Sequence, residues 1–558
     1  MEYRRYFHKK NDGCLPMIIS IGCTYLIYHY EKFTTLPIQK FILAHNKLWA
    51  KYFWQYTHFN DHFGGTLVGA VVLTYLIYQF FCFVDNQIWK FRENQKTARN
   101  KKSAFVWLGG ISTGELLQQG HQGGLAPNQF IFLGLEDCCL NFVAFGGIGS
   151  GKTSRLILPL VYCLTRNYQG KELGGLVFDV KGDFGFQFKE TAKPETKIIK
   201  VGVSPDALGF NLLDGLTPEL ASSYLNSALL LGNGANDKFW VDSATQLIKN
   251  VLGILQHCDN AYNLQATYKF IFDDQYAAEK KREAAANALA GGNEIEMAKV
   301  NNCMDYLQKI YGTFDEKVQQ SIKATVSTVL EPFQAPELAS KFCDSSAETV
   351  SIYKILDGNF LLVDLPLAVW GMGAKVIYTL IKLRFFSMVQ ERVVNSNLNQ
   401  DIPCVFICDE YQDVISVSRS GLSDLSFWDK SRSAKCIGII SSQSVSSFRA
   451  ACHDRDLADT VLQNFRQKFC FRTEDLATID YFQRLAGDTE HRRVVESCGR
   501  SGGQASSGWS EQYYKENVIT PQLMRGLNSN YVVAFMNISG QSYDDVIYMH
   551  PYYELVKT

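Results

Sequence analysis

The segment NFVAFGGIGSGKTSRLIL, residues 141–158, decides the fold class of this chain. An apolar run typical of a β-strand, Phe142 to Phe145, enters a glycine-rich turn, and a helix-forming run begins near Lys152. The turn fits the pattern G-x-x-x-x-G-K-[ST]. In this pattern the glycines let backbone N–H groups point at phosphates, the lysine neutralises charge, and the hydroxyl ligates Mg²⁺. A chance glycine turn between a strand and a helix is the alternative. The residues expected to bind a nucleoside triphosphate are Gly146, Gly147, Ile148, Gly149, Ser150, Gly151, Lys152 and Thr153.

The composition is typical of a globular protein with more than one domain. The chain has 558 residues, of which 46% are hydrophobic and 20% charged, and this balance excludes global disorder. The formal net charge of −1 hides an asymmetry: residues 1–105 carry 14 Lys and Arg against 6 Asp and Glu, and the remainder carries 41 against 50. Proteins that coat nucleic acid have a basic body. Any contact with DNA is therefore expected to be local, for instance along a pore.

The fifteen cysteines are scattered and form no pair at metal-ligand spacing. Buried free thiols in a reducing compartment are favoured over zinc sites or disulfides. The cysteine pattern therefore predicts that the body of the protein is cytosolic.

Two apolar segments near the N-terminus predict a membrane anchor. The first, at about residues 15–30, is short for a span and follows a basic start. A signal anchor or tilted span is favoured over a cleaved signal, since no clean cleavage site follows. The second, at about residues 66–84, is a cleaner span, with a buried helix of a soluble domain as the alternative. Lysines and arginines before the first span and after the second predict that both ends face the cytoplasm, although the intervening loop also holds four lysines.

The chain beyond the anchor divides by its secondary-structure pattern. Residues 103–217 alternate strand-like runs with helices, residues 218–345 are nearly all helical, and residues 346–558 return to the alternating pattern. We expect residues 1–102 to be the anchor, the two alternating parts to form one nucleotide-binding domain, and the helical part to be an inserted domain. The helical part shows no catalytic constellation.

The turn after the second strand carries three polar candidates. The strand Gly175 to Asp179 runs into VKGDF, so that Asp179, Lys181 and Asp183 follow the carboxyl end of a strand. Ligands gather at such ends in open α/β sheets. A plain polar turn is an equally good interpretation.

A second half of the site is expected about 250 residues downstream of the glycine-rich turn. The apolar run before Asp409 and Glu410 reads as a buried strand. An acid in this place holds the Mg²⁺ shell, and an adjacent glutamate can orient the attacking water. The next strand, Cys436 to Ser442, ends in Gln443, which is expected to sense the γ-phosphate; a strand-capping amide is the alternative.

An arginine precedes the strand that ends in Gln443. Arg432 is placed at the end of a short predicted helix. Phosphoryl transfer benefits from an arginine that a neighbouring subunit supplies, and Arg432 is the candidate, with an ordinary surface arginine as the alternative. Further on, Ser497 to Ser510 is rich in glycine and serine and predicts a flexible loop. Two closing strands are expected at Tyr531 to Asn537 and Asp544 to Met549.

The order of these features resembles a known family. The chain contains, in order, two apolar segments, GGIGSGKT, VFDVKGDF, GFNLLDGL, a helical segment opening with KFW, FICDEYQDV, IISSQS and ITPQLMRGLNSNYVVAF. This order is similar to that of the type IV secretion coupling proteins, the TraD/TraG-like inner-membrane ATPases of conjugation and effector export, which are related to FtsK-type hexameric translocases. The resemblance covers essentially the whole chain. It implies an α/β fold: a RecA-like P-loop NTPase domain with an inserted all-α domain and an N-terminal two-helix transmembrane anchor.

The resemblance also implies site residues, cofactors and partners. ATP and Mg²⁺ are the expected ligands, and a homo-hexamer in the bacterial inner membrane, multi-pass and with most of the chain in the cytoplasm, is the expected assembly. The roles carried over are phosphate binding for Lys152, Mg²⁺ binding for Thr153 and Asp409, water activation for Glu410, phosphate sensing for Gln443 and a trans contact for Arg432. One departure is D-V-K-G-D at residues 179–183, where the family often has D-P-K-G-E.

The function expected from the resemblance is recruitment of DNA–relaxase complexes or protein effectors, with possible adaptors, and their transport toward a type IV secretion channel. A double-stranded DNA translocase of the FtsK kind is one alternative, although such pumps add a basic DNA-reading domain that this chain lacks. A nucleotide-stabilised receptor or scaffold without motor activity is the other. Glu410 argues against the scaffold, because binding alone needs the metal-holding acid but not the water-orienting one.

Overall fold

A computed structural model describes residues 104–556, apart from residues 120, 122, 234–237, 345–346, 419–420 and 502–503, and Gln79 alone of the first 103 residues. Apart from Gln79, both predicted membrane spans therefore lie outside the described residues. Within the described part, no helix is long and apolar enough to cross a membrane. The chain forms two compact units, Met1–Asn100 and Lys101–Thr558, and the account below concerns the second.

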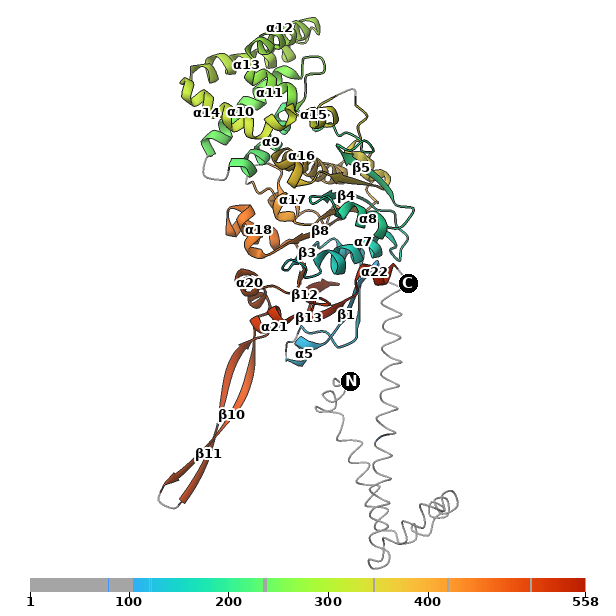
Figure 1. The fold of residues 1–558 in the computed structure, drawn as a ribbon, viewed down its shortest axis with the longest axis vertical. Helices are drawn as coiled ribbons and strands as arrows, with labels where there is room; N and C mark the ends of the chain where they lie inside the picture. Colours follow the sequence, from blue (N-terminus) through green and yellow to red (C-terminus); the bar gives the residue numbers. More distant parts are fainter. Residues whose placement is uncertain are drawn as a thin grey trace, which may run out of the picture. The chain divides into compact units, whose positions relative to one another are not determined.

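A mixed sheet of eleven described strands forms the centre of this unit (Figure 1). The strand order is β2-β1-β13-β12-β9-β3-β8-β7-β4-β6-β5. The seven strands from β9 to β5 run parallel to one another, and the remaining four pair antiparallel. The strands are β1 (Val106–Ser112), β2 (Phe130–Leu133), β3 (Phe142–Phe145), β4 (Gly174–Asp179), β5 (Lys197–Gly202), β6 (Asn359–Asp364), β7 (Cys404–Cys408), β8 (Cys436–Ser442), β9 (Gln467–Cys470), β12 (Tyr531–Ile538) and β13 (Gln541–Met549).

The central strands are apolar throughout because both faces of the sheet are covered. Every residue of β3 is buried, and successive side chains enter different core layers. Val143 and Phe145 pack in one layer, whereas Phe142 and Ala144 pack in the other. This arrangement confirms the predicted α/β class.

Helices connect the parallel strands and cover both faces of the sheet. α7 contributes to the layer of Phe142, and α16 contributes to the layer of Val143. The helices outside the segment between β5 and β6 are α5 (Glu115–Gln118), α6 (Leu135–Cys138), α7 (Leu158–Thr165), α8 (Phe184–Thr191), α16 (Leu367–Val394), α17 (Asp424–Phe427), α18 (Val445–Cys452), α19 (Arg455–Leu462), α20 (Leu476–Ala486), α21 (Pro521–Gly526) and α22 (Tyr552–Leu555).

The segment between β5 and β6 is helical, and it packs together as one group (Figure 1). Its amphipathic sequence explains this, since α10 buries Ala244, Leu247, Ile248 and Val251 at helical spacing. α9 and α14 rest on α16 and so connect the group to the sheet. The helices are α9 (Pro218–Asn233), α10 (Lys238–Leu255), α11 (Leu264–Phe272), α12 (Asp274–Ala290), α13 (Glu294–Lys309), α14 (Glu316–Leu330) and α15 (Pro336–Phe342).

The prediction of a flexible loop at Ser497 to Ser510 is wrong. Residues 497–501 and 504–510 belong to an antiparallel ribbon of two strands, β10 (Asp488–Ser501) and β11 (Gln504–Asn517), which Figure 1 shows projecting beyond α20 and α21. Backbone pairing gives this stretch its structure, although its glycines and serines have little strand propensity.

Candidate active site

Three distant segments of the sequence meet at one edge of the sheet. β3, β8, β7 and β4 are neighbours and run parallel, so their carboxyl ends lie side by side. The glycine-rich turn follows β3, Gln443 follows β8, and Asp409 and Glu410 follow β7. The carboxyl edge of a parallel sheet is where ligands bind in α/β proteins.

The turn from Gly146 to Thr153 is attached to its neighbours through the main chain. The Gly146 N–H donates to the carbonyl of Gln443 (3.3 Å), and the Gly147 N–H donates to the carbonyl of Arg472 (3.0 Å). Gly151 adopts φ 101°, a conformation that a side chain would strain. The loop therefore has a defined shape between the ends of β8 and β9.

The interior of this turn offers hydrogen-bond donors. The Lys152 ammonium donates to the carbonyls of Gly146 (2.7 Å) and Gly147 (3.3 Å). Burial lowers the pKa of Lys152, and the negative charges of Glu410 and Asp409 oppose this shift. The buried Ser150 hydroxyl has no hydrogen-bond partner among the described residues. A cation and an unsatisfied hydroxyl in a glycine-rich turn fit a phosphate group.

Thr153 and Asp409 meet directly although 256 positions separate them. The Thr153 hydroxyl donates to Asp409 Oδ2 at 2.7 Å. Asp409 Oδ1 accepts from the Ser441 hydroxyl and from the Glu410 N–H (3.1 Å). A carboxylate beside a hydroxyl supplies the oxygen ligands that Mg²⁺ prefers, and the ion takes its other ligands from waters and substrate phosphates. The two residues thus fit the predicted magnesium site.

Glu410 is held firmly beside this pair. Its backbone adopts φ 58° and ψ 52°, an uncommon left-handed conformation for a glutamate. The buried carboxylate accepts from Lys181 Nζ (2.5 Å) and from Gln412 Nε2 (2.8 Å). Burial by itself raises the pKa of Glu410, but these two hydrogen bonds and the charges of Lys181 and Lys152 outweigh it, and the pKa is lowered. Glu410 is therefore ionised at neutral pH.

Gln443 and Arg432 lie at opposite ends of β8. The exposed Gln443 side chain follows the carboxyl end, next to the glycine-rich turn. Arg432 precedes the amino end, in a turn after α17 and not on a helix end as predicted. Its guanidinium contacts Glu136 (2.9 Å). Since β8 has seven residues, about 20 Å separates the two ends, and the structure does not bring Arg432 to the site of its own chain.

Of the three polar candidates after β4, only Lys181 reaches the site. The Asp179 carboxylate accepts from the N–H groups of Gly182 (2.6 Å) and Gly185 (2.7 Å), so it shapes the turn. Asp183 is exposed. Lys181 extends to Glu410, a contact between residues 229 positions apart.

Sequence reasoning missed Ser441 and Gln412, which contact the carboxylates of Asp409 and Glu410. β7 pairs with β8 so that Cys408 lies opposite Ile440, and one further residue brings Asp409 opposite Ser441. This strand register is not readable from the sequence. Gln412 could have been noticed, because it follows Glu410 by two positions in the motif DEYQD.

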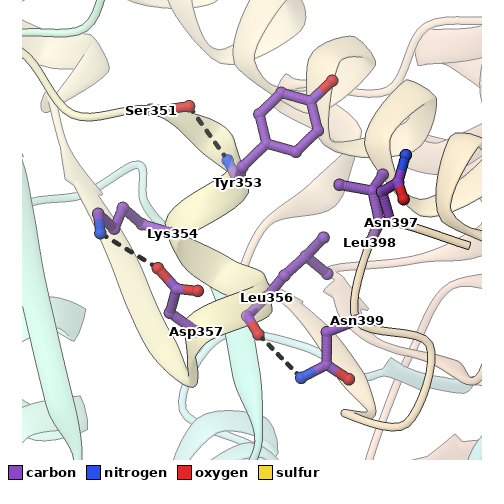
Figure 2. Close-up of a pocket in the computed structure, with 8 residues that line it drawn as sticks. All are labelled: Ser351, Tyr353, Lys354, Leu356, Asp357, Asn397, Leu398 and Asn399. Carbon is purple, nitrogen blue, oxygen red and sulfur yellow. Dashed lines mark hydrogen bonds and ion pairs between the residues drawn. The ribbon is translucent and has the colours of Figure 1, made fainter. Parts of the chain in front are cut away.

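A separate pocket of about 350 Å³ lies elsewhere on the molecule (Figure 2). It is lined by residues just before β6 and by Asn397, Leu398 and Asn399 ahead of β7, and so lies at the amino ends of the parallel strands. Its polar groups have partners within the pocket: Lys354 pairs with Asp357 (3.1 Å), and Asn399 donates to the carbonyl of Leu356 (3.3 Å) (Figure 2). This pocket is distinct from the nucleotide site.

Comparisons with known proteins agree with this fold. Residues 403–529 match the family model described as the TraM recognition site of TraD and TraG. Solved structures of the bacterial conjugative coupling protein TrwB share the fold over 80% of this chain and 95% of theirs. One is a trigonal form with sulphate (TM-score 0.54, 15% identity), one has a non-hydrolysable GTP analogue (0.53, 15%), and one has ADP and Mg²⁺ (0.53, 14%). No curated protein matches the chain. The family match over residues 403–529 and the shared fold agree with the resemblance that the motifs indicated, to the TraD/TraG-type coupling proteins of type IV secretion.

Proposed function

We propose that this chain is an ATP-hydrolysing coupling protein that recruits DNA–relaxase complexes or protein effectors and drives them toward a type IV secretion channel. The single observation that carries the proposal is the meeting of Lys152, Thr153, Asp409 and Glu410 at one edge of the sheet. These four groups come from two segments and supply the parts that nucleotide hydrolysis needs.

Each group has a chemical task. The backbone N–H groups of the glycine-rich turn and the Lys152 ammonium bind the phosphates of ATP. Thr153 and Asp409 would hold Mg²⁺, which neutralises charge on the phosphates. Glu410, ionised and buried, orients the attacking water and accepts its proton. Gln443, just after the carboxyl end of β8, would contact the γ-phosphate. The nucleotide complexes of TrwB support this assignment by analogy of fold.

Arg432 completes the site only in an assembly of several subunits. It lies at the far end of β8 from its own phosphate-binding turn, and its side chain is 57% exposed. An exposed arginine in this place suits contact with the nucleotide of a neighbouring subunit. We therefore propose a ring, with six subunits as in the hexameric relatives that the motifs resemble.

The membrane anchor and the cargo belong to the same proposal. The apolar segments at about residues 15–30 and 66–84 would fix the protein in the inner membrane, with the sheet and helices in the cytoplasm. The matched region, named for TraM recognition, supports binding of a relaxosome component by residues 403–529. The helical group between β5 and β6 is the proposed inserted domain that meets substrate.

The decisive experiment measures ATP hydrolysis by the full chain in detergent or vesicles, with and without single-stranded DNA, over a range of protein concentrations. We expect a rate per subunit that rises with concentration and DNA, and loss of hydrolysis in Lys152→Ala. Lys189→Ala, an exposed lysine on α8, is the matched control. Stimulation by an effector but not by DNA would assign protein cargo. Absence of hydrolysis in the unaltered protein would overturn the motor and favour the scaffold.

Mixing experiments test the trans role of Arg432. Arg432→Ala and Glu410→Gln place their defects on opposite sides of a shared interface, so mixed rings contain some intact sites. We expect the mixture to hydrolyse ATP faster than either variant alone. Equal rates would show that Arg432 does not act in a neighbouring subunit.

A further inference from the structure

The turn after β4 carries a lysine to which the proposed reaction gives no role. Lys181 Nζ lies 2.5 Å from Glu410 Oε1, and this contact joins two neighbouring strands, β4 and β7, at the carboxyl edge. The carboxylate of Glu410 is 6% exposed, whereas the side chain of Lys181 is 53% exposed. The lysine thus reaches from the surface onto a buried catalytic group.

The backbone around Lys181 is built to hold it in place. Asp179 accepts two backbone hydrogen bonds across the turn, from Gly182 and Gly185. Gly182 has φ 91°, and a Cβ there would lie 2.7 Å from the ring of Pro366. The Leu367 N–H donates to the carbonyl of Val180 (3.0 Å), which attaches the turn to the start of α16. The Lys181 Cα is therefore fixed by β4 and α16 together.

Glu410 depends on other residues for its orientation. Its backbone is left-handed, and one of its two carboxylate oxygens accepts a hydrogen bond from Gln412 on its own turn. Lys181 is the donor to the other oxygen. A carboxylate held at both oxygens keeps a single rotamer while its remaining lone pairs can accept from a water.

We propose that Lys181 is a positioning residue for hydrolysis: it holds Glu410 in the orientation that activates the water. This inference rests on the proposed function, since it assigns Lys181 a role only through Glu410. Hydrolysis is sensitive to such orientation, because misplacing a catalytic group by about 1 Å can cost on the order of 100-fold in rate. The Lys181 side chain is half-exposed.

The first test compares Lys181→Met with Lys181→Arg and with the control Lys189→Met. We expect Lys181→Met to lower kcat about tenfold and to leave KM for ATP within about twofold, because positioning affects the chemical step and not binding. Lys181→Arg keeps a donor to Glu410 and should recover most of the rate. Lys189→Met should match the unaltered protein. An unchanged kcat in Lys181→Met, or equal losses in the Met and Arg variants, would overturn the inference.

The second test separates positioning from direct phosphate contact. In a Glu410→Gln background, Lys181 has no carboxylate to position, so adding Lys181→Met should change neither the residual rate nor the affinity for a fluorescent ATP analogue by more than about twofold. A lysine that binds the phosphates itself would weaken that affinity, and this result would overturn the inference. Normal turnover in Glu410→Gln alone would instead remove the role of Glu410 from the proposed function, and the two failures are thus distinguishable.

Discussion

Two lysine–carboxylate pairs lie near the turn that follows β7, and they differ in exposure. At the rim, Lys181 contacts Glu410, and the lysine is half-exposed. One residue further, Tyr411 donates to Asp424, which pairs with Lys382 at 2.6 Å, and both of these charged side chains are fully buried. The buried pair cannot move without losing all its partners. The rim pair borders solvent through its lysine, and this difference separates an ion pair inside the core from one at the candidate site.

The buried pair has hydrogen-bond partners on several elements. Asp424 accepts from Trp428 Nε1 (3.0 Å) and from the Ser416 N–H (2.7 Å) in addition to Tyr411 and Lys382. Burial lowers the pKa of Lys382, while the charge and hydrogen bond of Asp424 oppose the shift. A fully bonded network of this kind fixes the segment after Glu410 against α16 and α17.

The largest effect, on stability, is expected when the buried pair is broken. Lys382→Met leaves Asp424 charged and unpaired in the core, which should lower the free energy of unfolding by about 3–5 kcal/mol. Urea unfolding followed by tryptophan fluorescence measures this loss. The double variant Lys382→Met/Asp424→Asn carries no buried charge and should recover part of the stability. A single variant as stable as the unaltered protein would remove the contrast between the two pairs.

Another buried lysine, Lys468, extends the comparison, because no carboxylate is paired with it among the described residues. Burial in β9 lowers the pKa of Lys468 to about 8 from an ordinary value near 10.5. The unfolded chain therefore binds more protons between these values, and the contribution of Lys468 to stability rises with pH through this window, by at most about 3 kcal/mol. The free energy of unfolding should therefore increase more between pH 7.5 and pH 10 in the unaltered protein than in Lys468→Met. A constant difference would contradict the burial of a titrating lysine.

The next effect concerns rate and not stability. Glu410→Gln keeps the hydrogen bond from Gln412 but lacks the charge that activates water, and kcat should fall by about 100-fold or more. ATP binding and the free energy of unfolding should change little, since glutamine has nearly the same size as glutamate and the partner Lys181 is half-exposed. Single-turnover hydrolysis and equilibrium binding measure the two parts. A large loss of stability would place Glu410 with the structural pair.

The smallest effect is expected at the exposed pair of Arg432 and Glu136, whose side chains are 57% and 83% exposed. Glu136→Ala should change the free energy of unfolding by about 0.5 kcal/mol or less, because exposed ion pairs contribute little. Hydrolysis should stay normal, since Arg432 keeps its position. Thermal unfolding of the variant provides the measurement. A larger loss would show that the pair shapes the turn before β8.

Much of the site was predictable because its signals are local. The glycine-rich turn, the acids after β7 and the glutamine after β8 each follow an apolar strand in the sequence, and the structure places all of them at one edge. The nearly all-helical character of residues 218–345 was also predicted from the sequence, and α9 to α15 lie in this segment. The ribbon of β10 and β11 was missed, since its pairing depends on cross-strand hydrogen bonds that composition does not reveal.

The sequence by itself determined the α/β class, the glycine-rich turn and the resemblance to the coupling proteins, because these depend on short patterns of residue type and spacing. Only the tertiary structure decided which polar residues meet. Lys181 contacts Glu410 and Ser441 contacts Asp409 because β4, β7 and β8 are neighbours in a particular register. Strand order and register arise from packing of the whole sheet between its two helical layers, and that packing couples residues hundreds of positions apart.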